Sequence, residues 1–221
     1  MPDIGRRSVI HILITTNTKG RKREEKAMRL WSAQALDVYE LIKDRGVYRM
    51  DPEKASCYED FREAYDWLVR EMEKKVGKRP DGVLYPVWAY AVYDGKSREP
   101  DLYSLGGPGE ELILFELEIP DDRLVLTEYD TWHYVLNKWF YCRVKDGEDF
   151  QKQNDWFDAL PPEEKERVME RSWQAVFDTE LRDNGEWDRN GQFVQATFWE
   201  LRAGDIVSCR KCVVPEEEEE E

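Results

Sequence analysis

Histidine is nearly absent from this sequence, with two copies among 221 residues. Only His133 lies inside the predicted domain, so a Ser-His-Asp or Cys-His catalytic arrangement has one histidine to use. No G-x-S-x-G, P-loop or G-x-G-x-x-G motif occurs, which excludes those catalytic and nucleotide-binding signatures. His133 is then either a general base or a residue that hydrogen-bonds near the start of a helix, and the second interpretation is the simpler one.

Cysteine is also scarce, with four copies. Cys209 and Cys212 form one C-x-x-C motif, whereas a structural zinc site needs a second pair or spaced histidines. The flanking residues Ile206, Val207 and Val213 favour a strand in which cysteine is a small apolar side chain. We therefore predict no metal site, and the reduced thiols are typical of a cytoplasmic protein.

Long apolar runs and a basic surplus are both missing. The mean hydropathy is −0.78, and no run approaches the roughly 20 apolar residues that span a bilayer, so we expect no membrane segment. The 33 basic residues face 48 acidic ones, giving a net charge of −15. This charge disfavours direct binding to a nucleic-acid backbone and suits a basic protein partner.

The two ends of the chain differ in composition from the rest. Residues 1–27 hold seven basic and three acidic side chains, and residues 216–221 are all glutamate. Runs of like charge repel themselves and stay solvated, so we predict a disordered tail over 216–221. For residues 1–27 we expect either a disordered basic extension or a segment upstream of the native start. Hydrophobic residues make up 41% of the whole chain, and residues 28–215 are predicted to form a single globular domain.

Hydrophobic periodicity predicts an α+β fold, with a mostly antiparallel sheet and several packed helices. Apolar residues at spacings of three and four predict helices over 35–45 and 58–76, a third beginning at an Asp130 cap with an apolar face from Trp132 to Phe140, and a fourth from 160. β-branched and alternating patterns predict strands over 28–33, 47–50, 84–93, 112–119, 123–127, 193–201 and 205–214.

Several sequence blocks are distinctive in type and order, and four of them contain tryptophan. They are Arg29–Gln34, Gly46–Arg49, Ala64–Trp67, Tyr85–Tyr90, Glu116–Pro120, Trp132–Asn137 and Val194–Thr197. Together they resemble a bacterial family of domains of unknown function, DUF3841, over roughly residues 28–214. The resemblance implies no activity, cofactor or catalytic residue.

Glu116 and Glu118 are the sharpest chemical pair in the sequence. Two residues apart on a predicted strand, they point to the same face. They could position a ribose hydroxyl, stabilise a developing cation or hold a divalent metal. The competing interpretation is a solvent-facing side of an amphipathic strand, although Leu112 and Leu114 on the same face suggest partial burial.

The order of the elements also resembles compact ADP-ribosyltransferase-like domains, which surround NAD with a first-strand polar residue, middle aromatics and a late glutamate. Gln195 stands in the place of that late glutamate. The resemblance implies an NAD-like nucleotide, catalytic candidates Glu116, Glu118 and Gln195, and cofactor-binding candidates Arg29, Gln34, Trp88 and His133. Alternatively, the tryptophan belongs to the core and the glutamine amides satisfy backbone groups.

Two functions remain open from the sequence. The first is an enzyme that handles a nucleotide-like ligand. The second is a non-catalytic binding or regulatory module for a basic protein partner or a small nucleotide. Turnover of NAD would favour the first, and a steep salt dependence of partner binding would favour the second.

Overall fold

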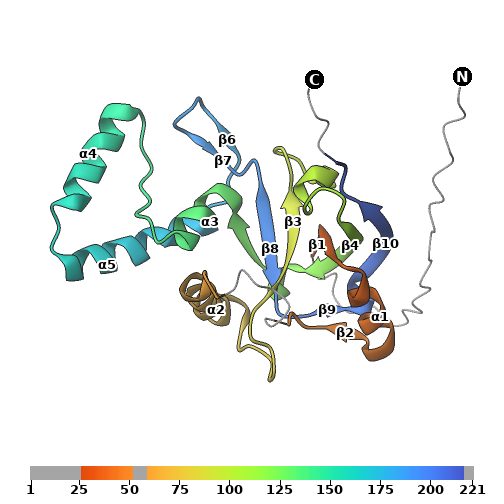
Figure 1. Ribbon diagram of the computed structural model, residues 1–221. Helices are drawn as coiled ribbons and strands as arrows, with labels where there is room; N and C mark the ends of the chain where they lie inside the picture. Colours follow the sequence, from red (N-terminus) through yellow and green to blue (C-terminus); the bar gives the residue numbers. More distant parts are fainter. Residues whose placement is uncertain (1–25, 52–58, 217–221) are drawn as a thin grey trace, which may run out of the picture.

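The computed structural model describes residues 26–51 and 59–216, and this part of the chain has an α+β architecture. A six-stranded antiparallel sheet lies at the centre, with helices packed on both of its faces (Figure 1). The predicted fold class is therefore confirmed. The basic extension up to residue 25 and the glutamates from 217 onward lie outside the described residues.

The central sheet has the strand order β10-β4-β1-β3-β8-β5. Its strands are β1 (Ala27–Ala35), β3 (Val87–Val92), β4 (Glu111–Pro120), β5 (Val125–Glu128), β8 (Val194–Phe198) and β10 (Ile206–Val213). There are also two short two-stranded sheets: β2 (Val47–Tyr48) pairs with the sequence-distant β9 (Leu201–Arg202), and β6 (Arg182–Asp183) forms a hairpin with β7 (Arg189–Asn190).

The predicted continuous strand over 193–201 does not form. β8 ends at Phe198 and the chain then turns away, so that β9 pairs with β2 in a separate sheet. Glu200, which lies between the two strands, is buried against Arg49 and Arg202. The turn places the buried Glu200 carboxylate beside these two arginines. The alternation of the sequence does not predict which residues pair with it.

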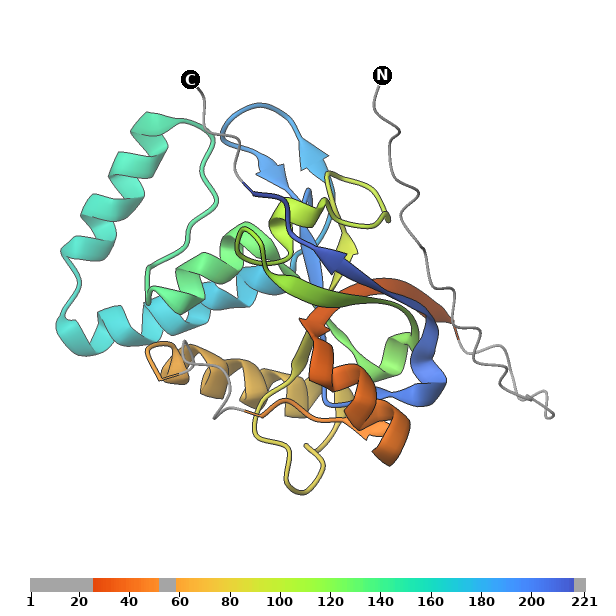
Figure 2. The same ribbon diagram turned by 45° about the vertical axis from the view of Figure 1, so that its right-hand side comes forward.

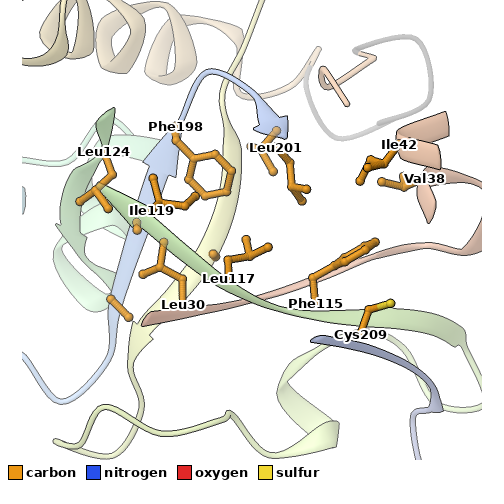
Figure 3. Packing of buried hydrophobic residues seen from close by; sticks show 14 of the residues in the cluster. Leu30, Val38, Ile42, Phe115, Leu117, Ile119, Leu124, Phe198, Leu201 and Cys209 are labelled. Atoms are coloured by element: carbon orange, nitrogen blue, oxygen red, sulfur yellow. The ribbon is translucent and has the colours of Figure 1, made fainter. Parts of the chain in front are cut away.

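One face of the sheet packs against α1 (Leu36–Arg45). Alternate residues of β4, including Phe115 and Leu117, meet Val38 and Ile42 of the helix in the largest core cluster (Figure 3). Gly46 ends α1 in the left-handed conformation, with φ of 74°, and its N–H donates to the Ile42 carbonyl at 2.8 Å. The predicted helix and its glycine terminus are both confirmed.

The other face carries two aromatic clusters. Beside β5 and β8, it packs against α2 (Arg62–Val76), α3 (Tyr129–Leu136) and the 3₁₀ segment η5 (Trp173–Phe177), with Trp67, Trp132 and Trp173 buried between them. Toward β4 and β10, Trp31 is buried with Leu112 and Leu114. These four tryptophans belong to the core, as expected for large side chains on structured elements.

Two helices extend away from the sheet: α4 (Gly147–Asp158) and α5 (Pro162–Ser172) (Figures 1 and 2). Neither contains a buried residue. The proline-marked start of α5 is confirmed, whereas α4 has no counterpart among the predicted elements because its sequence is mostly polar. Within the described residues, no helix combines the length and the hydrophobicity that a bilayer crossing requires.

The predicted cap of the third helix is wrong. Asp130 lies inside the first turn of α3, and the N-cap is Glu128, whose Oε2 accepts a hydrogen bond from the Thr131 N–H at 2.6 Å. The helix also ends early, at Leu136, and Lys138 adopts a positive φ of 55°. The apolar pattern that continues to Phe140 therefore belongs to a turn and the irregular segment after it, and not to the helix.

Candidate functional site

Glu116 and Glu118 lie on one face of β4, as their spacing predicts, but their surroundings differ. Glu116 Oε1 forms an ion pair with Arg29 Nη2 at 2.7 Å, and its Oε2 accepts from the Ser208 hydroxyl at 2.8 Å. Glu118 is exposed to solvent. The oxygens of Glu116 are thus occupied within the fold, and the two carboxylates share no partner among these contacts.

The two candidate glutamines also have partners within the fold. The Gln34 amide donates to the Ser32 hydroxyl at 2.8 Å, and that hydroxyl donates to the Trp88 carbonyl at 2.7 Å. Gln195 contacts Tyr90 on the neighbouring strand. Burial raises the pKa of Tyr90 to about 12, and the contact with Gln195 opposes that rise.

Trp88 and His133 lie in aromatic surroundings. The Trp88 ring is 5.3 Å from that of Trp132, and its buried Nε1–H has no hydrogen-bond partner among the described residues. His133 Nδ1 lies 2.9 Å from the Tyr129 carbonyl, one helical turn earlier, so this nitrogen carries the proton and donates.

Cross-strand register brings two of the seven candidates into one row. Glu116 pairs with Trp31, Trp31 with Tyr90, and Tyr90 with Gln195. Side chains that are directly opposite share a face, so this row crosses the sheet on one side. Alternation places Gln34 on the opposite face, and His133 lies on α3. The seven residues do not gather in one pocket.

A pocket of about 280 Å³ lies elsewhere, beside α3. Its walls come from β5 and α3, from residues 140–144, from α4 and from the loop that joins β6 to β7. The lining residues include Glu128, Asp130, Thr131, Tyr134, Tyr141, Arg143, Phe150, Glu186, Trp187 and Arg189, and none of the seven sequence candidates.

Glu128 is the unusual member of this pocket. It is 2% exposed, and although Oε2 caps α3, Oε1 is buried without a hydrogen-bond partner among the described residues. Burial raises the pKa of its carboxyl and the nearby charge of Asp130 adds to the rise, while contacts from Thr131 lower it. An unpartnered buried carboxylate oxygen is costly, so a group that donated a hydrogen bond to it would relieve that cost.

The two arginines of the pocket wall already have carboxylate partners. Arg143 Nη2 lies 2.8 Å from Asp188 Oδ1, and Arg189 Nε lies 3.5 Å from Asp183 Oδ1. Glu128, Asp130 and Glu186 also line the pocket. With these partners counted, carboxylates outnumber arginines around the pocket, which favours a cationic occupant.

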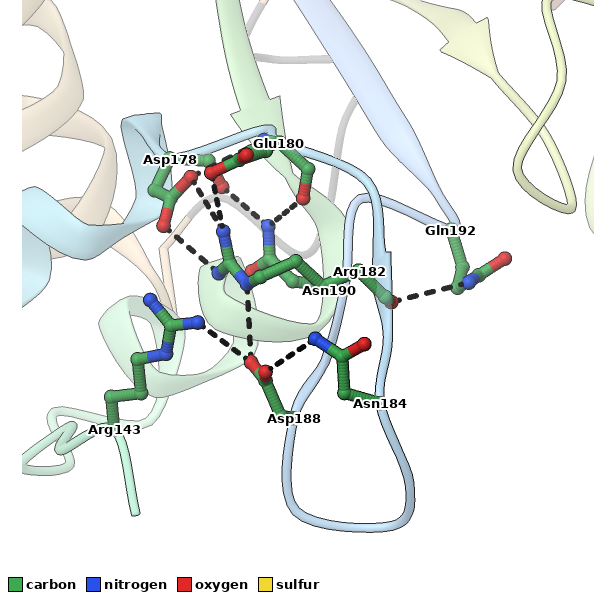
Figure 4. Close-up of polar contacts among 8 residues, drawn as sticks. All are labelled: Arg143, Asp178, Glu180, Arg182, Asn184, Asp188, Asn190 and Gln192. Carbon is green, nitrogen blue, oxygen red and sulfur yellow. Dashed lines mark hydrogen bonds and ion pairs between the residues drawn. The ribbon is translucent and has the colours of Figure 1, made fainter. Parts of the chain in front are cut away.

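A charged network anchors the hairpin that forms one wall (Figure 4). Arg182, at the base of the hairpin, contacts Asp178 at 2.9 Å, Glu180 at 3.3 Å and Asp188 at 3.1 Å. The Asn190 amide donates to the carbonyls of Asp178 and Glu180 at 2.9 and 2.8 Å. Because Asp188 also holds Arg143, the network ties the hairpin to the segment after α3.

Aromatic rings provide much of the remaining wall. Tyr134 and Tyr141 meet edge to face at 5.2 Å, and Phe150 of α4 lies 6.1 Å from Trp187 of the hairpin loop. Phe150 and Trp187 are 40% and 41% exposed. Exposed ring faces next to a surplus of carboxylates are suited to hold a cation.

A family model described as domain of unknown function DUF3841 matches residues 29–207. The chain belongs to this family. No curated protein and no solved structure matches it. The resemblance drawn from the sequence blocks is therefore confirmed.

In this DUF3841 domain, the sequence patterns above did not predict the pocket around Glu128. A signal was present: Glu128 shares a strand face with Leu126, so the alternation places its carboxylate on an apolar side of the sheet. Assigning the helix cap to Asp130 obscured this signal, because Asp130 lies inside α3 and the N-cap is Glu128.

The two cysteines of the C-x-x-C motif lie in apolar surroundings. Cys209 belongs to the core cluster beneath α1, and Cys212 belongs to the cluster of Trp31 on the other face. Burial raises the pKa of both thiols. Across the described ranges, no group of three or more histidine, cysteine, aspartate and glutamate side chains is arranged to hold a metal ion.

Proposed function

We propose that this DUF3841 domain is a non-catalytic binding module for a basic protein partner, and that the pocket beside Glu128 receives a cationic group of that partner. The observation that carries the proposal is the buried Oε1 of Glu128, which has no partner in the described part of the chain. A cationic N–H donor would satisfy it, and a hydrogen bond to a charged group contributes about 1.5–3 kcal/mol.

The charge of the whole chain supports the same partner. The net charge of −15 gives long-range attraction to a basic protein and accelerates association at low ionic strength. Glu128 would then provide a local contact within a broader electrostatic attraction. Its buried position makes that contact less sensitive to salt than contacts between exposed charges.

Binding of a fluorescein-labelled lysine-rich peptide, followed by anisotropy, tests the proposal, with an aspartate-rich peptide as the negative probe. We expect the basic peptide alone to bind, with an affinity that falls steeply between low and physiological salt. Glu128→Gln should weaken binding by about tenfold. Glu40→Gln is the matched control, because Glu40 is exposed on α1, away from the pocket. Equal binding of both peptides, or equal effects of both variants, would contradict the proposal.

A second candidate function is an enzyme that handles an NAD-like nucleotide. The row in which Trp31 and Tyr90 stand between Glu116 and Gln195 favours it, because all four side chains belong to one sheet face. The ion pair between Glu116 and Arg29 makes it the weaker candidate. Release of nicotinamide from NAD, measured by chromatography and lost in Glu118→Gln and Gln195→Ala, would establish it; no release would remove it.

We further propose that the protein acts in the cytoplasm. Cys142, Cys209 and Cys212 are free thiols, and such thiols are typical of reducing compartments. Fractionation of cells that express the chain with an epitope tag tests this location, and recovery from a secreted or envelope fraction would contradict it.

A further inference from the structure

Glu128 lines the pocket and, within the described residues, keeps one carboxylate oxygen uncommitted. Oε2 is already committed to the Thr131 N–H at 2.6 Å, while Oε1 has no partner among the residues described. A guanidinium binds a carboxylate best through two parallel N–H donors on two oxygens. That bidentate arrangement would require Glu128 to give up the cap of α3.

An ammonium group matches a single oxygen better. It is a compact charge with three donors that point in different directions, so each donor can meet a different acceptor. Asp130 and Glu186 also line the pocket and can accept from the remaining donors. The rings of Tyr134, Tyr141 and Trp187 border the same space and attract a cation through their faces.

An alkyl chain suits the rest of the pocket. A volume of about 280 Å³ exceeds what an ammonium group alone occupies, and Phe140, Val144 and Phe150 supply an apolar wall. Lysine side chains bury their methylene groups along such surfaces while the charged end finds a polar partner.

We infer that the Glu128 pocket selects a primary ammonium group at the end of an alkyl chain, a lysine side chain of the partner, over a guanidinium. The inference rests on the proposed function, since it names which basic residue of the partner enters the pocket. A lysine side chain and a free alkylamine share this chemistry, and the experiment separates them.

The direct test uses three small probes: n-butylamine, n-butylguanidinium and tetramethylammonium. Their binding is followed by ¹H–¹⁵N NMR at the Thr131 amide and the Trp187 indole N–H, which lie on two sides of the pocket. We expect n-butylamine to bind at least threefold more tightly than the other two. Tetramethylammonium has no N–H for Oε1, and the guanidinium cannot pair with both oxygens of Glu128 while Oε2 caps α3. Glu128→Gln should weaken n-butylamine binding by about tenfold, and Glu40→Gln should leave it unchanged.

Competition with the lysine-rich peptide identifies the natural source of the ammonium group. If n-butylamine displaces the peptide, a partner lysine occupies the pocket; if it binds at the pocket without displacing the peptide, the inference of a partner lysine is overturned. Equal or tighter binding of the guanidinium, or of tetramethylammonium, would also overturn the inference and leave the proposed function standing. Failure of the basic peptide and of all three probes to bind would overturn the proposed function itself.

Discussion

Two regions of the molecule bury carboxylates, but in the described part of the chain only one of them pairs its carboxylates with arginines. Near β9, Glu200 is 8% exposed and meets Arg49 at 2.8 Å and Arg202 at 3.0 Å, while Asp205 is 6% exposed and receives a bidentate pair from Arg123 at 2.7 and 2.9 Å. Beside α3, Glu128 is buried more deeply, at 2%, and no arginine or lysine pairs with it in the described residues.

The difference appears in the protonation of the two glutamates. Burial alone raises the pKa of a carboxyl in both places. At Glu200 the two arginines overcome the effect of burial and hold the pKa below its usual value. At Glu128 burial prevails and the pKa is raised. The fold therefore stabilises the charge of Glu200 internally, whereas the charge of Glu128 lacks an internal counterion, which supports a role in binding an external cation.

Breaking the paired region should have the largest effect. Arg123→Met leaves Asp205 buried without its cation, and breaking a buried pair on one side costs about 3 kcal/mol of unfolding free energy. Urea unfolding followed by fluorescence measures this loss. Arg70→Met is the matched control, because Arg70 and Glu170 are both more than half exposed and such a pair contributes at most about 1 kcal/mol. Equal losses in the two variants would contradict the distinction between buried and exposed pairs.

The same substitution at the two buried glutamates should give opposite results. Glu200→Gln removes the charge that two half-exposed arginines share, and we expect a loss of about 2 kcal/mol. Glu128→Gln keeps an oxygen that can accept from the Thr131 N–H and removes an unpaired buried charge, so the unfolding free energy should stay the same or rise. Urea unfolding of both variants at pH 7 decides, and a larger loss at Glu128 would contradict the comparison.

Most of the fold follows from local sequence patterns. Alternation over 112–119 identifies β4, the spacing from Tyr65 to Val76 identifies α2, and Gly46 identifies the end of α1. The start of α3 and the existence of α4 do not follow in this way. Two acids and a threonine compete for one cap position, and α4 packs too little of its surface to need a continuous apolar stripe.

The candidate site depends on tertiary structure to a greater degree. Glu116 and Gln195 reach one row, as alternation allows, but the Arg29 and Ser208 partners of Glu116 come from neighbouring strands whose register no single strand encodes. The Glu128 pocket is assembled from four segments between residues 128 and 189. Patterns within one element do not report such an assembly.

The stability of the two variants should also depend on pH in opposite directions. The folded-state pKa of Glu128 is raised, so its contribution to stability is greatest below its unfolded pKa of about 4.3 and is lost as pH rises through the folded value. The wild-type protein should therefore lose stability relative to Glu128→Gln as pH rises from 4 to 7. The folded-state pKa of Glu200 is lowered, so relative to Glu200→Gln the wild-type protein gains stability over the same range.

Subtracting the unfolding free energy of the wild-type protein from that of each variant cancels the titration of groups that both proteins share. Around Glu128 these are Asp130, Tyr134, Tyr141, Cys142 and Arg143, together with the more distant Arg182 and Glu186. Urea unfolding at pH 4, 5.5 and 7 measures both differences. If the two differences changed with pH in the same direction, the pKa values of Glu128 and Glu200 would be shifted alike, which would contradict the comparison.

Trp187→Ala should have the smallest effect and act on binding alone. Trp187 is 41% exposed on the hairpin loop, which the Arg182 network anchors independently of the ring, so the unfolding free energy should change little. A ring face near a cation contributes about 0.5–1 kcal/mol at an exposed site, so n-butylamine affinity should fall two- to fivefold. NMR titration at the Thr131 amide measures it, with Tyr103→Ala, an exposed aromatic residue outside the pocket, as the control. An unchanged affinity in Trp187→Ala would leave Glu128 as the source of cation selectivity without help from the aromatic wall.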